Sequence, residues 1–284
     1  SRKLGIPFVF WWQDVLSDAM DTILSEKLGL LGRVAGAHYR RLEKRLLSES
    51  DAIICIAPQF QELLKKWKIE RPFHVIGNWA PIESLPVLPK DNSFSRQHDL
   101  HDKFVLLYSG TLGMKQNPQI VIDAAKYLRH QTDVAILVIS DGVGMTHLRQ
   151  EKARLDLHNL LLLPLQPFER LPEILATGDV HLVLLHANAG RFCVPSKVWS
   201  AYCAARPSLL VMPKFNYAAT LTEEIGAGWV LANDEETSLP HKILQLKQKP
   251  ELRMRMGQQA RHYAEANYPI THIADRFSAV ITSL

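Results

Sequence analysis

The fold is decided by the stretch FVLLYSGTLGMKQNP, which occupies residues 104–118. Its first five residues, Phe104–Tyr108, form an apolar run that predicts a buried strand, and a helical pattern begins at Pro118. Between the strand and the helix, Gly110 and Gly113 let the backbone approach a ligand closely. A strand that passes through a turn into a helix is the repeating unit of an α/β protein.

The same alternation continues on both sides of this stretch. Short apolar runs predict strands at residues 8–12, 52–56, 73–76, 134–140, 160–163, 180–185, 208–211 and 228–231. Amphipathic patterns predict helices at residues 32–48, 145–155, 168–176 and 195–204, from Pro58, and over the chain after residue 231. Such alternation predicts doubly wound parallel sheets with helices on both faces, and ligands bind these sheets beyond the carboxyl ends of the strands.

A segment without this alternation separates the two series of strands. Residues 77–95 are rich in Pro, Asn and Ser and show little periodicity, which is typical of a connector between domains. The length of 284 residues fits two domains or one large α/β unit. We therefore expect two α/β domains joined by this connector.

The composition excludes several classes of protein. With 47% hydrophobic and 22% charged residues, the chain has the composition of a globular protein rather than of a disordered one. No apolar run approaches the roughly 20 residues that span a bilayer, so we expect a soluble protein. Lys and Arg total 33 against 29 Asp and Glu, and the formal net charge of +4 permits contact with phosphates or an anionic membrane without requiring nucleic acid.

Cysteine usage and the first residues bear on the location of the chain. Cys55, Cys193 and Cys203 lack CxxC spacing, so a reducing cytoplasm is favoured over a disulfide framework. The chain opens at Ser1 without a signal-peptide pattern and runs at once into an apolar stretch. We therefore expect a cytoplasmic protein whose sequence begins partway through a domain.

Two glycine-containing loops that follow predicted strands are candidates for binding. The first, at residues 109–117, adds the mobile positive charge of Lys115, but it matches neither the GxGxxG nor the P-loop spacing. The second, at residues 140–144, contains Gly142 and opens a helix. Each loop fits a simple strand–helix turn as well as a ligand site.

A third loop, at residues 163–167, carries prolines on both sides of Leu165 and Gln166. Proline limits pairing within a sheet and so leaves carbonyl and amide groups for other partners. A flat ligand such as a nucleotide base is one partner that fits these groups.

The fourth loop, at residues 186–197, gives the sharpest signal. It follows a buried strand and leads into a helix at Pro195-Ser196, where unpaired amides and the helix dipole favour an anion. Lys197 lies in that first turn, where a cation is unfavourable unless a negative group is bound nearby. A diphosphate satisfies both the amides and the ammonium, whereas the alternative is a solvated lysine at a helix end.

Other signals are weaker. The 12 histidines show no HExxH or paired metal spacing, so we expect no metal cofactor, and no GxSxG pattern is present. One helical stretch carries many cations and few acids, and it fits either an anionic membrane surface or a solvated face. Its basic residues are Arg33, Arg40, Arg41, Lys44 and Arg45.

Five short motifs then occur in order between residues 108 and 228. They are YSGTLG at residues 108–113, DG at 141–142, VPSKV at 194–198, AARP at 204–207 and EEIGAG at 223–228. Together they resemble the donor-binding half of GT-B glycosyltransferases of family 4, and within it the WbuB/WcaI-like group that builds O-antigen and other surface polysaccharides. Upstream, residues 8–14 and 75–78 resemble segments of the same group.

This resemblance implies two facing Rossmann-like domains with a nucleotide-sugar between them. Residues 1–76 would be the rear part of the acceptor-side domain, 77–100 the linker, 101–262 the donor-binding domain and 263–284 helices that cross back to the first domain. The activity implied is metal-independent transfer of a sugar, with retention, from a UDP- or GDP-sugar to a lipid-linked or polysaccharide acceptor. The enzyme would lie at the inner membrane face, with its basic residues available for peripheral contact.

The resemblance also implies roles for particular residues. Lys115 and Lys197 would be the catalytic cations beside the diphosphate, with Asp14 on the acceptor side, and fixed positive groups stabilise the charge of a departing diphosphate. The donor-binding residues implied are Gly110, Thr111, Gly113, Gly142, Leu165, Gln166, Val194, Pro195, Ser196 and Ser200.

The sequence departs from the family pattern at several points. Phe192 and Ser200 stand where many members have two glutamates, Thr111 stands where many have a basic residue, and Gln13 replaces a histidine. The first strands and the Gly-rich loop of the family's N-terminal domain are not in the sequence, so we expect a fragment that binds nucleotide-sugar without necessarily transferring it. Two alternatives remain open: a nucleotide-sugar 2-epimerase-like isomerase, and a non-enzymatic binding half that works with a separate chain.

Overall fold

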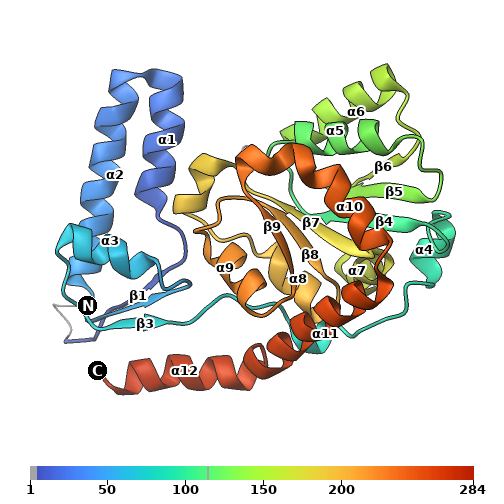
Figure 1. Ribbon diagram of the computed structural model, residues 1–284. Helices are drawn as coiled ribbons and strands as arrows, with labels where there is room; N and C mark the ends of the chain where they lie inside the picture. The colour runs from blue at the N-terminus through green and yellow to red at the C-terminus, as the bar shows by residue number, and fades with distance from the viewer. Residues whose placement is uncertain (1–4, 114) are drawn as a thin grey trace. The chain divides into compact units, whose positions relative to one another are not determined.

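The computed structural model describes residues 5–113 and 115–284, so Met114 of the first candidate loop lies outside the described residues. The chain forms two compact units (Figure 1). Unit 1 comprises the chain up to Asn78, Asn188–Val194 and Ile270–Leu284, and unit 2 comprises Trp79–Ala187 and Pro195–Pro269.

Unit 2 is built on a six-stranded parallel sheet in the order β6-β5-β4-β7-β8-β9. Its strands are β4 (Phe104–Ser109), β5 (Val134–Ile139), β6 (Leu160–Leu163), β7 (Val180–Leu184), β8 (Ser208–Val211) and β9 (Gly228–Leu231). All six residues of β5 are buried, as are all five of β7, because helices cover both faces of a doubly wound sheet. This explains why these strands appear in the sequence as continuous apolar runs rather than as alternating ones.

Helices follow nearly every strand of unit 2. Among them, α5 packs with α6 and α10, and α8 packs with α11. The helices of the unit are α4 (Ser93–Gln97), α5 (Gln119–Leu128), α6 (Val143–Leu155), α7 (Leu171–Thr177), α8 (Lys197–Cys203), α9 (Tyr217–Glu224), α10 (Leu239–Lys247) and α11 (Pro250–Asn267). Short 3₁₀ turns are η2 (Ile82–Ser84), η3 (Phe168–Arg170) and η5 (Asn233–Ser238), while η4 (Ala187–Arg191) begins in unit 2 and continues into unit 1.

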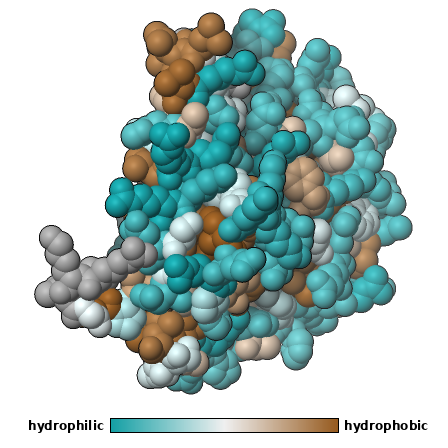
Figure 2. Space-filling model, turned by 90° about the vertical axis from the view of Figure 1, so that its left-hand side faces the viewer, coloured by the Kyte–Doolittle hydropathy of each residue, from teal (hydrophilic) through white to brown (hydrophobic). Residues whose placement is uncertain are grey.

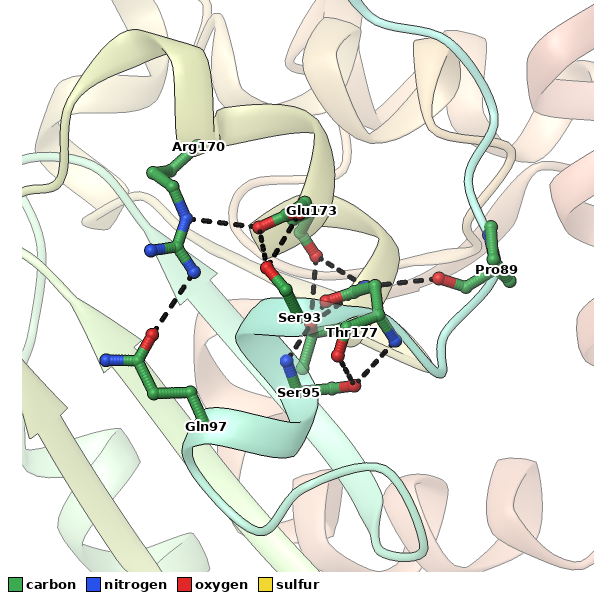
Figure 3. A network of polar contacts seen from close by, with 8 residues as sticks. Pro89, Ser93, Ser95, Gln97, Arg170, Glu173 and Thr177 are labelled. Carbon is green, nitrogen blue, oxygen red and sulfur yellow. Dashed lines mark hydrogen bonds and ion pairs between the residues drawn. The ribbon is translucent and has the colours of Figure 1, made fainter.

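A polar network fixes the segment before β4 against α7 (Figure 3). The Ser93 hydroxyl donates to the carboxylate of Glu173 at 2.8 Å, and Arg170 Nε donates to the same carboxylate at 3.1 Å. Asn92 Nδ2 donates to the carbonyl oxygens of Pro89 and Glu173, each at 3.1 Å. The network holds α7 in place beside the sheet.

Two half-buried guanidinium groups, of Arg206 and Arg261, bind backbone carbonyl groups of unit 2. Arg206 donates to the carbonyl oxygens of Gly178 at 3.0 Å, Ala176 at 2.9 Å and Leu88 at 3.1 Å. Arg261 on α11 donates to Leu85 and Cys203 in the same way. The chain segment that leads from Trp79 to β4 is therefore attached to the helices of unit 2.

Unit 1 contains a three-stranded parallel sheet in the order β1-β2-β3. Its elements are β1 (Val9–Trp12), α1 (Leu16–Leu28), α2 (Leu30–Glu49), β2 (Ala52–Cys55), α3 (Phe60–Trp67), β3 (Phe73–Val75) and α12 (Ile270–Thr282). The last helix packs on this sheet, since the Phe277 ring lies 5.1 Å from Trp11 and Arg276 donates to the Val75 carbonyl.

Helices α1 and α2 form a hairpin that leads away from the small sheet (Figure 1). They approach closely because a Cβ on Gly32 would overlap the Leu24 carbonyl group, and one on Gly36 would lie 2.7 Å from Asp21 Cα. At the base of the hairpin, the buried carboxylate of Glu43 accepts hydrogen bonds from Trp12 Nε1 and from amides at the start of α1. Only glycine permits this spacing of the two helices.

The structure confirms the predicted α/β class with parallel sheets, and each predicted strand is present within a residue or two. The helix predicted from Pro58 is present from Phe60, and the helix predicted over 195–204 is present as the shorter Lys197–Cys203. The segment 77–95, predicted as a connector, contains η2 and the start of α4. Helices α1 and α9 were not predicted. Within the described residues, no helix has both the length and the apolar composition to cross a bilayer.

Candidate functional site

A cavity of about 390 Å³ lies in unit 2 beside the centre of the six-stranded sheet. The chain places β5 and β6 on one side of β4, and β7, β8 and β9 on the other, so the strand order reverses between β4 and β7. In open α/β sheets ligands bind at such a reversal, outside the carboxyl ends of the strands. Ser109 and Gly110, at the end of β4, line the cavity.

Most of the cavity lining is apolar, with polar groups gathered near the strand ends and α8. Apolar residues on α7, namely Leu171, Ile174 and Leu175, contribute to it. Further lining residues are Trp79, Ala80, Pro81, Leu107, Ile139, Leu165, Gln166, Pro167, His181, Leu182, Val183, Ser196, Lys197 and Ser200. An apolar pocket with a few convergent polar groups has the composition of a small-molecule site.

Lys197 is the cation of this lining. Its Nζ donates to the Thr111 carbonyl oxygen at 3.3 Å and lies 5.3 Å from the centre of the Tyr108 ring. Gly110 makes room for the lysine, because a Cβ there would lie 2.8 Å from Lys197 Cε. The φ of +113° at Gly110 is also one that residues with a side chain rarely adopt. The ammonium therefore lies directly beside the turn that ends β4.

That turn is held from below by Tyr108. The buried phenol donates to the Thr111 carbonyl at 2.9 Å, and burial raises the pKa of the Tyr108 hydroxyl well above its usual value, so it remains a donor. The turn also joins the loop after β5, since Leu112 N donates to Asp141 O and Gly144 N donates to Leu112 O, each at 3.1 Å. These contacts give the loops at the sheet edge a fixed backbone.

Glycine is required where the two loops meet. Gly142 has a φ of +90°, and a Cβ at Gly144 would lie 2.6 Å from Leu112 Cγ. Lys115 connects the first loop to the loop after β7, because its carbonyl oxygen accepts a hydrogen bond from His186 N at 2.7 Å. Three loops of the sheet edge are thus joined through their backbones.

His181 on β7 lies beneath the cavity with a fully buried ring. Its Nε2 lies 2.9 Å from the Leu175 carbonyl oxygen, and burial lowers the pKa of the imidazole to about 4. The ring is therefore neutral at physiological pH. A Cβ on Gly178 would lie 3.1 Å from this ring, so the chain bends around the histidine.

The structure gathers part of the predicted donor-binding set around one cavity. The residues that line it are Gly110, Leu165, Gln166, Ser196, Lys197 and Ser200. The others in unit 2 lie in neighbouring loops without lining the cavity, namely Thr111, Gly113, Lys115, Gly142 and Pro195. Val194 and the exposed Asp14, which follows β1, belong to unit 1.

Two sets of lining residues were not predicted. Trp79, Ala80 and Pro81 lie in the segment predicted as a connector, where lack of periodicity conceals a role in the site. The apolar face of α7 was predicted as helical, but nothing local indicates that it faces a cavity. Among residues 5–113 and 115–284, no group of three or more His, Cys, Asp and Glu side chains is placed to hold a metal ion.

A family model described as glycosyl transferases group 1 matches residues 90–263, which include the whole six-stranded sheet and most of the cavity lining. The chain belongs to this family. Most of the cavity is therefore formed by the part of the chain that matches this family. The match confirms the glycosyltransferase family that the sequence motifs indicate.

Two curated relatives are named as glycosyltransferases. The chain is 28% identical over 231 residues to the Escherichia coli K12 protein named as colanic acid biosynthesis glycosyl transferase WcaI, covering 78% of this chain and 55% of that protein. It is 26% identical over 207 residues to the Pseudomonas aeruginosa protein named as glycosyltransferase WbjE, covering 72% and 51%. The chain spans about half the length of these relatives.

Solved structures show the same fold. Anabaena HepE in complex with UDP matches with a TM-score of 0.80 at 17% identity, over 98% of this chain and 72% of that one. The lipopolysaccharide glycosyltransferase WaaG matches with a TM-score of 0.73 at 17% identity, over 96% and 74%. This group 1 chain therefore has the GT-B fold, as predicted, with two parallel sheets.

Proposed function

We propose that this group 1 glycosyltransferase chain binds a UDP- or GDP-sugar in the cavity of unit 2. The observation that carries the proposal is the position of Lys197 and Gly110 in that cavity, at the point where the strand order of the sheet reverses. HepE was solved with UDP and also with UDP-glucose, and this supports a nucleotide-sugar as the ligand class.

In this proposal the diphosphate lies beside the turn that follows β4. The Lys197 ammonium, now bound to the neutral Thr111 carbonyl, meets the phosphate oxygens, and the Ser196 hydroxyl lies on the same side. Lys115 stays, with Lys197, a proposed catalytic cation. The proposed donor-binding set also keeps Thr111, Gly113, Gly142, Val194 and Pro195. A fixed positive charge stabilises the nucleoside diphosphate as it departs from the sugar, which is where transfer needs help most.

The base and ribose occupy the other side of the cavity. Leu165 and Gln166, in the loop after β6, offer backbone groups to the base, and the Gln166 side chain is folded onto the Pro164 carbonyl at 2.8 Å. The rings and aliphatic side chains of Trp79, Pro81 and Ile174 supply apolar surface to the flat ligand. Ser200 provides a hydroxyl for the ribose.

We propose transfer with retention and without a metal, to a lipid-linked or polysaccharide acceptor in surface polysaccharide synthesis, as in the WbuB/WcaI-like group. Unit 1 is proposed as the acceptor side, with Asp14 near the acceptor, and the protein as cytoplasmic and peripheral to the inner membrane. The similarity to WcaI and WbjE supports the transferase activity.

The test is isothermal calorimetry of the chain with UDP, GDP and the matching nucleosides. Lys197→Ala is expected to weaken diphosphate binding by tenfold or more, since charge-assisted contacts contribute about 1.5–3 kcal/mol, and to leave nucleoside binding nearly unchanged. Lys126→Ala, at an exposed lysine on α5, is the matched control. Equal losses for both ligand types would reject the assignment of Lys197.

A second measurement separates the activities that remain open. The chain is incubated with labelled nucleotide-sugar and a lipid extract as acceptor. Labelled glycolipid with released nucleoside diphosphate supports transfer, an altered sugar without released nucleotide supports an isomerase, and binding without either product supports a half that needs a partner chain.

A further inference from the structure

The hairpin of α1 and α2 has an unusual distribution of side chains. Leu30, Leu31 and Val34, at the start of α2, are 78%, 76% and 70% exposed, and Leu28, at the end of α1, is 56% exposed. All four lie at the turn between the helices. Figure 2, seen from the side that carries the hairpin, shows hydrophobic surface gathered at its upper end.

These residues cannot turn inward. The inner face of α2 carries Gly32 and Gly36. Atoms of α1 fill the space that a side chain at either position would need, so the helices leave no room for a leucine between them. The apolar side chains at the tip are therefore directed away from the hairpin by its own packing. A rigid protrusion that ends in leucines and a valine has the form of an anchor for an apolar phase.

Several charged side chains of the hairpin lie between its helices or at its base, away from the apolar tip. Arg40 forms ion pairs with Asp18 at 3.4 Å and Asp21 at 2.8 Å, and Glu43 is buried at the base of the hairpin. Arg40 thus joins the two helices, and its membrane contact stays a prediction. The remaining basic residues of α2 that were predicted as a membrane contact are Arg33, Arg41, Lys44 and Arg45, of which Arg45 pairs with Glu49 at 2.8 Å and Lys44 lies over the Trp67 ring.

Arg33 and Arg41 are exposed near the apolar tip. Leu30, Val34 and Arg41 share one side of α2, because positions i, i+4 and i+11 fall on one helical face. At 1.5 Å per residue, Arg41 lies about 10 Å behind Val34 along the helix. The apolar residues at the end, with Arg41 about 10 Å behind Val34, match the order of acyl chains and anionic headgroups at a membrane surface. Arg33 lies at the tip beside Val34, and its long side chain can reach toward the headgroups.

We propose that the tip of the α1–α2 hairpin inserts into the outer part of an anionic lipid bilayer, with Arg41 at the phosphate level and Arg33 extending its side chain from the tip toward the phosphates. The occupant is lipid because the cations beside the tip complement anionic headgroups. This inference gives a place to the peripheral membrane contact of the proposed function and rests on that function only for the reason to be at a membrane. The insertion itself needs no substrate.

The experiment is flotation of the chain with vesicles of equal parts phosphatidylcholine and phosphatidylglycerol, and with phosphatidylcholine alone. We expect binding to the anionic vesicles that weakens with salt. Leu30→Gln with Leu31→Gln should lower the partition coefficient about a hundredfold, since the burial of two leucines is lost. Arg33→Gln with Arg41→Gln should remove most of the preference for anionic lipid and its salt dependence.

Matched controls come from exposed apolar residues elsewhere. Met254 on α11 and Ile281 on α12 are 61% and 58% exposed, and Met254→Gln with Ile281→Gln should bind vesicles as the parent does. UDP calorimetry on each variant shows that unit 2 is folded and reports on the donor site separately. A parent chain that floats with anionic vesicles but does not bind UDP would reject the proposed function alone. A parent chain that binds UDP but does not float would reject the membrane insertion of the hairpin alone.

The depth to which the tip inserts is measured with a fluorophore attached to the Leu31→Cys variant. The labelling is selective because Cys55, Cys193 and Cys203 are buried. We expect a blue shift with anionic vesicles and quenching by brominated acyl chains. A label that stays in water on bound protein overturns the proposal. Sedimentation without lipid tests a second copy as the occupant: self-association that the Leu30→Gln, Leu31→Gln variant abolishes would also overturn it.

Discussion

The cavity of unit 2 and the hairpin of unit 1 are built with opposite polarity. Around the cavity, the apolar side chains lie inside, and the polar groups at the rim are joined by backbone hydrogen bonds such as that from Gly144 N to Leu112 O. In the hairpin, a carboxylate lies inside, on Glu43, while Leu30 and Leu31 are exposed. The first arrangement is that of a folded core that ends in a ligand site, and the second is that of a surface shaped for a partner.

The two regions also differ in the interactions that stabilise them. The sheet of unit 2 depends on apolar burial, which many residues share. The hairpin depends on a few polar contacts and on two glycines, so single substitutions should affect it strongly. The predictions below test this contrast.

The largest effect is expected for Glu43→Ala. The carboxylate accepts from Trp12 Nε1 and Leu16 N at 3.0 Å and from Ser17 N at 3.1 Å. Its removal takes this acceptor from the buried Trp12 Nε1 and Ser17 N, while Leu16 N keeps its bond to Asp14 O at 2.9 Å. We expect a loss of about 4 kcal/mol in the free energy of unfolding of unit 1, measured by urea denaturation. The exposed Glu62→Ala on α3 is the control. A change below about 1 kcal/mol would show that the hairpin does not depend on its inner carboxylate.

A second prediction concerns pH and the buried His181. Because the folded protein holds the imidazole pKa at about 4, against 6.5 for the ordinary group, the unfolded chain binds more protons between these values. The contribution of the neutral His181 to the free energy of unfolding is fully present above pH 6.5 and is lost as the pH falls toward 4. Between pH 7 and 4.5 the parent should lose about 2 kcal/mol more than His181→Gln, measured by urea denaturation at both pH values. Parallel pH curves for the two proteins would contradict this.

The smallest expected effect sharpens the cavity side of the contrast. Gly110→Ala introduces a Cβ at a φ of +113° and 2.8 Å from Lys197 Cε, so the flexible lysine must shift. UDP binding, measured by calorimetry, should weaken about fivefold, equivalent to about 1 kcal/mol. If Gly110 acts through the lysine, the same substitution in a Lys197→Ala background should cost almost nothing further. Full additivity would mean that the glycine acts on the ligand directly.

The sequence predicted the strands well because burial on both faces leaves continuous apolar runs such as residues 134–139. It did not reveal α1, since that helix has no side-chain cap of its own and its first amides bind Glu43, which lies 26 and 27 residues away along the chain. For α9 a local signal existed: Asn216 Oδ1 accepts from Ala218 N and caps the helix. Non-local capping is invisible to a pattern, whereas local capping is not.

The sequence predicted the part of the candidate site that depends on topology, and it missed the part that depends on tertiary contacts. Gly110, Lys197 and Leu165 follow predicted strands or open a predicted helix, so topology alone brings them to one sheet edge. Trp79 reaches the cavity through the path of an irregular segment that Arg206 and Arg261 attach to distant helices. Such a path depends on tertiary contacts and leaves no periodic trace.

The Thr111 carbonyl oxygen serves two donors at once, the Tyr108 hydroxyl and the Lys197 ammonium. A carbonyl oxygen has two lone pairs, so these bonds are independent of each other. When the ammonium is drawn toward an incoming anion, the tyrosine still restrains the loop. In the proposed donor complex, the ammonium would move toward the phosphate while Tyr108 keeps the loop in place, so binding would need no rearrangement of the strand end.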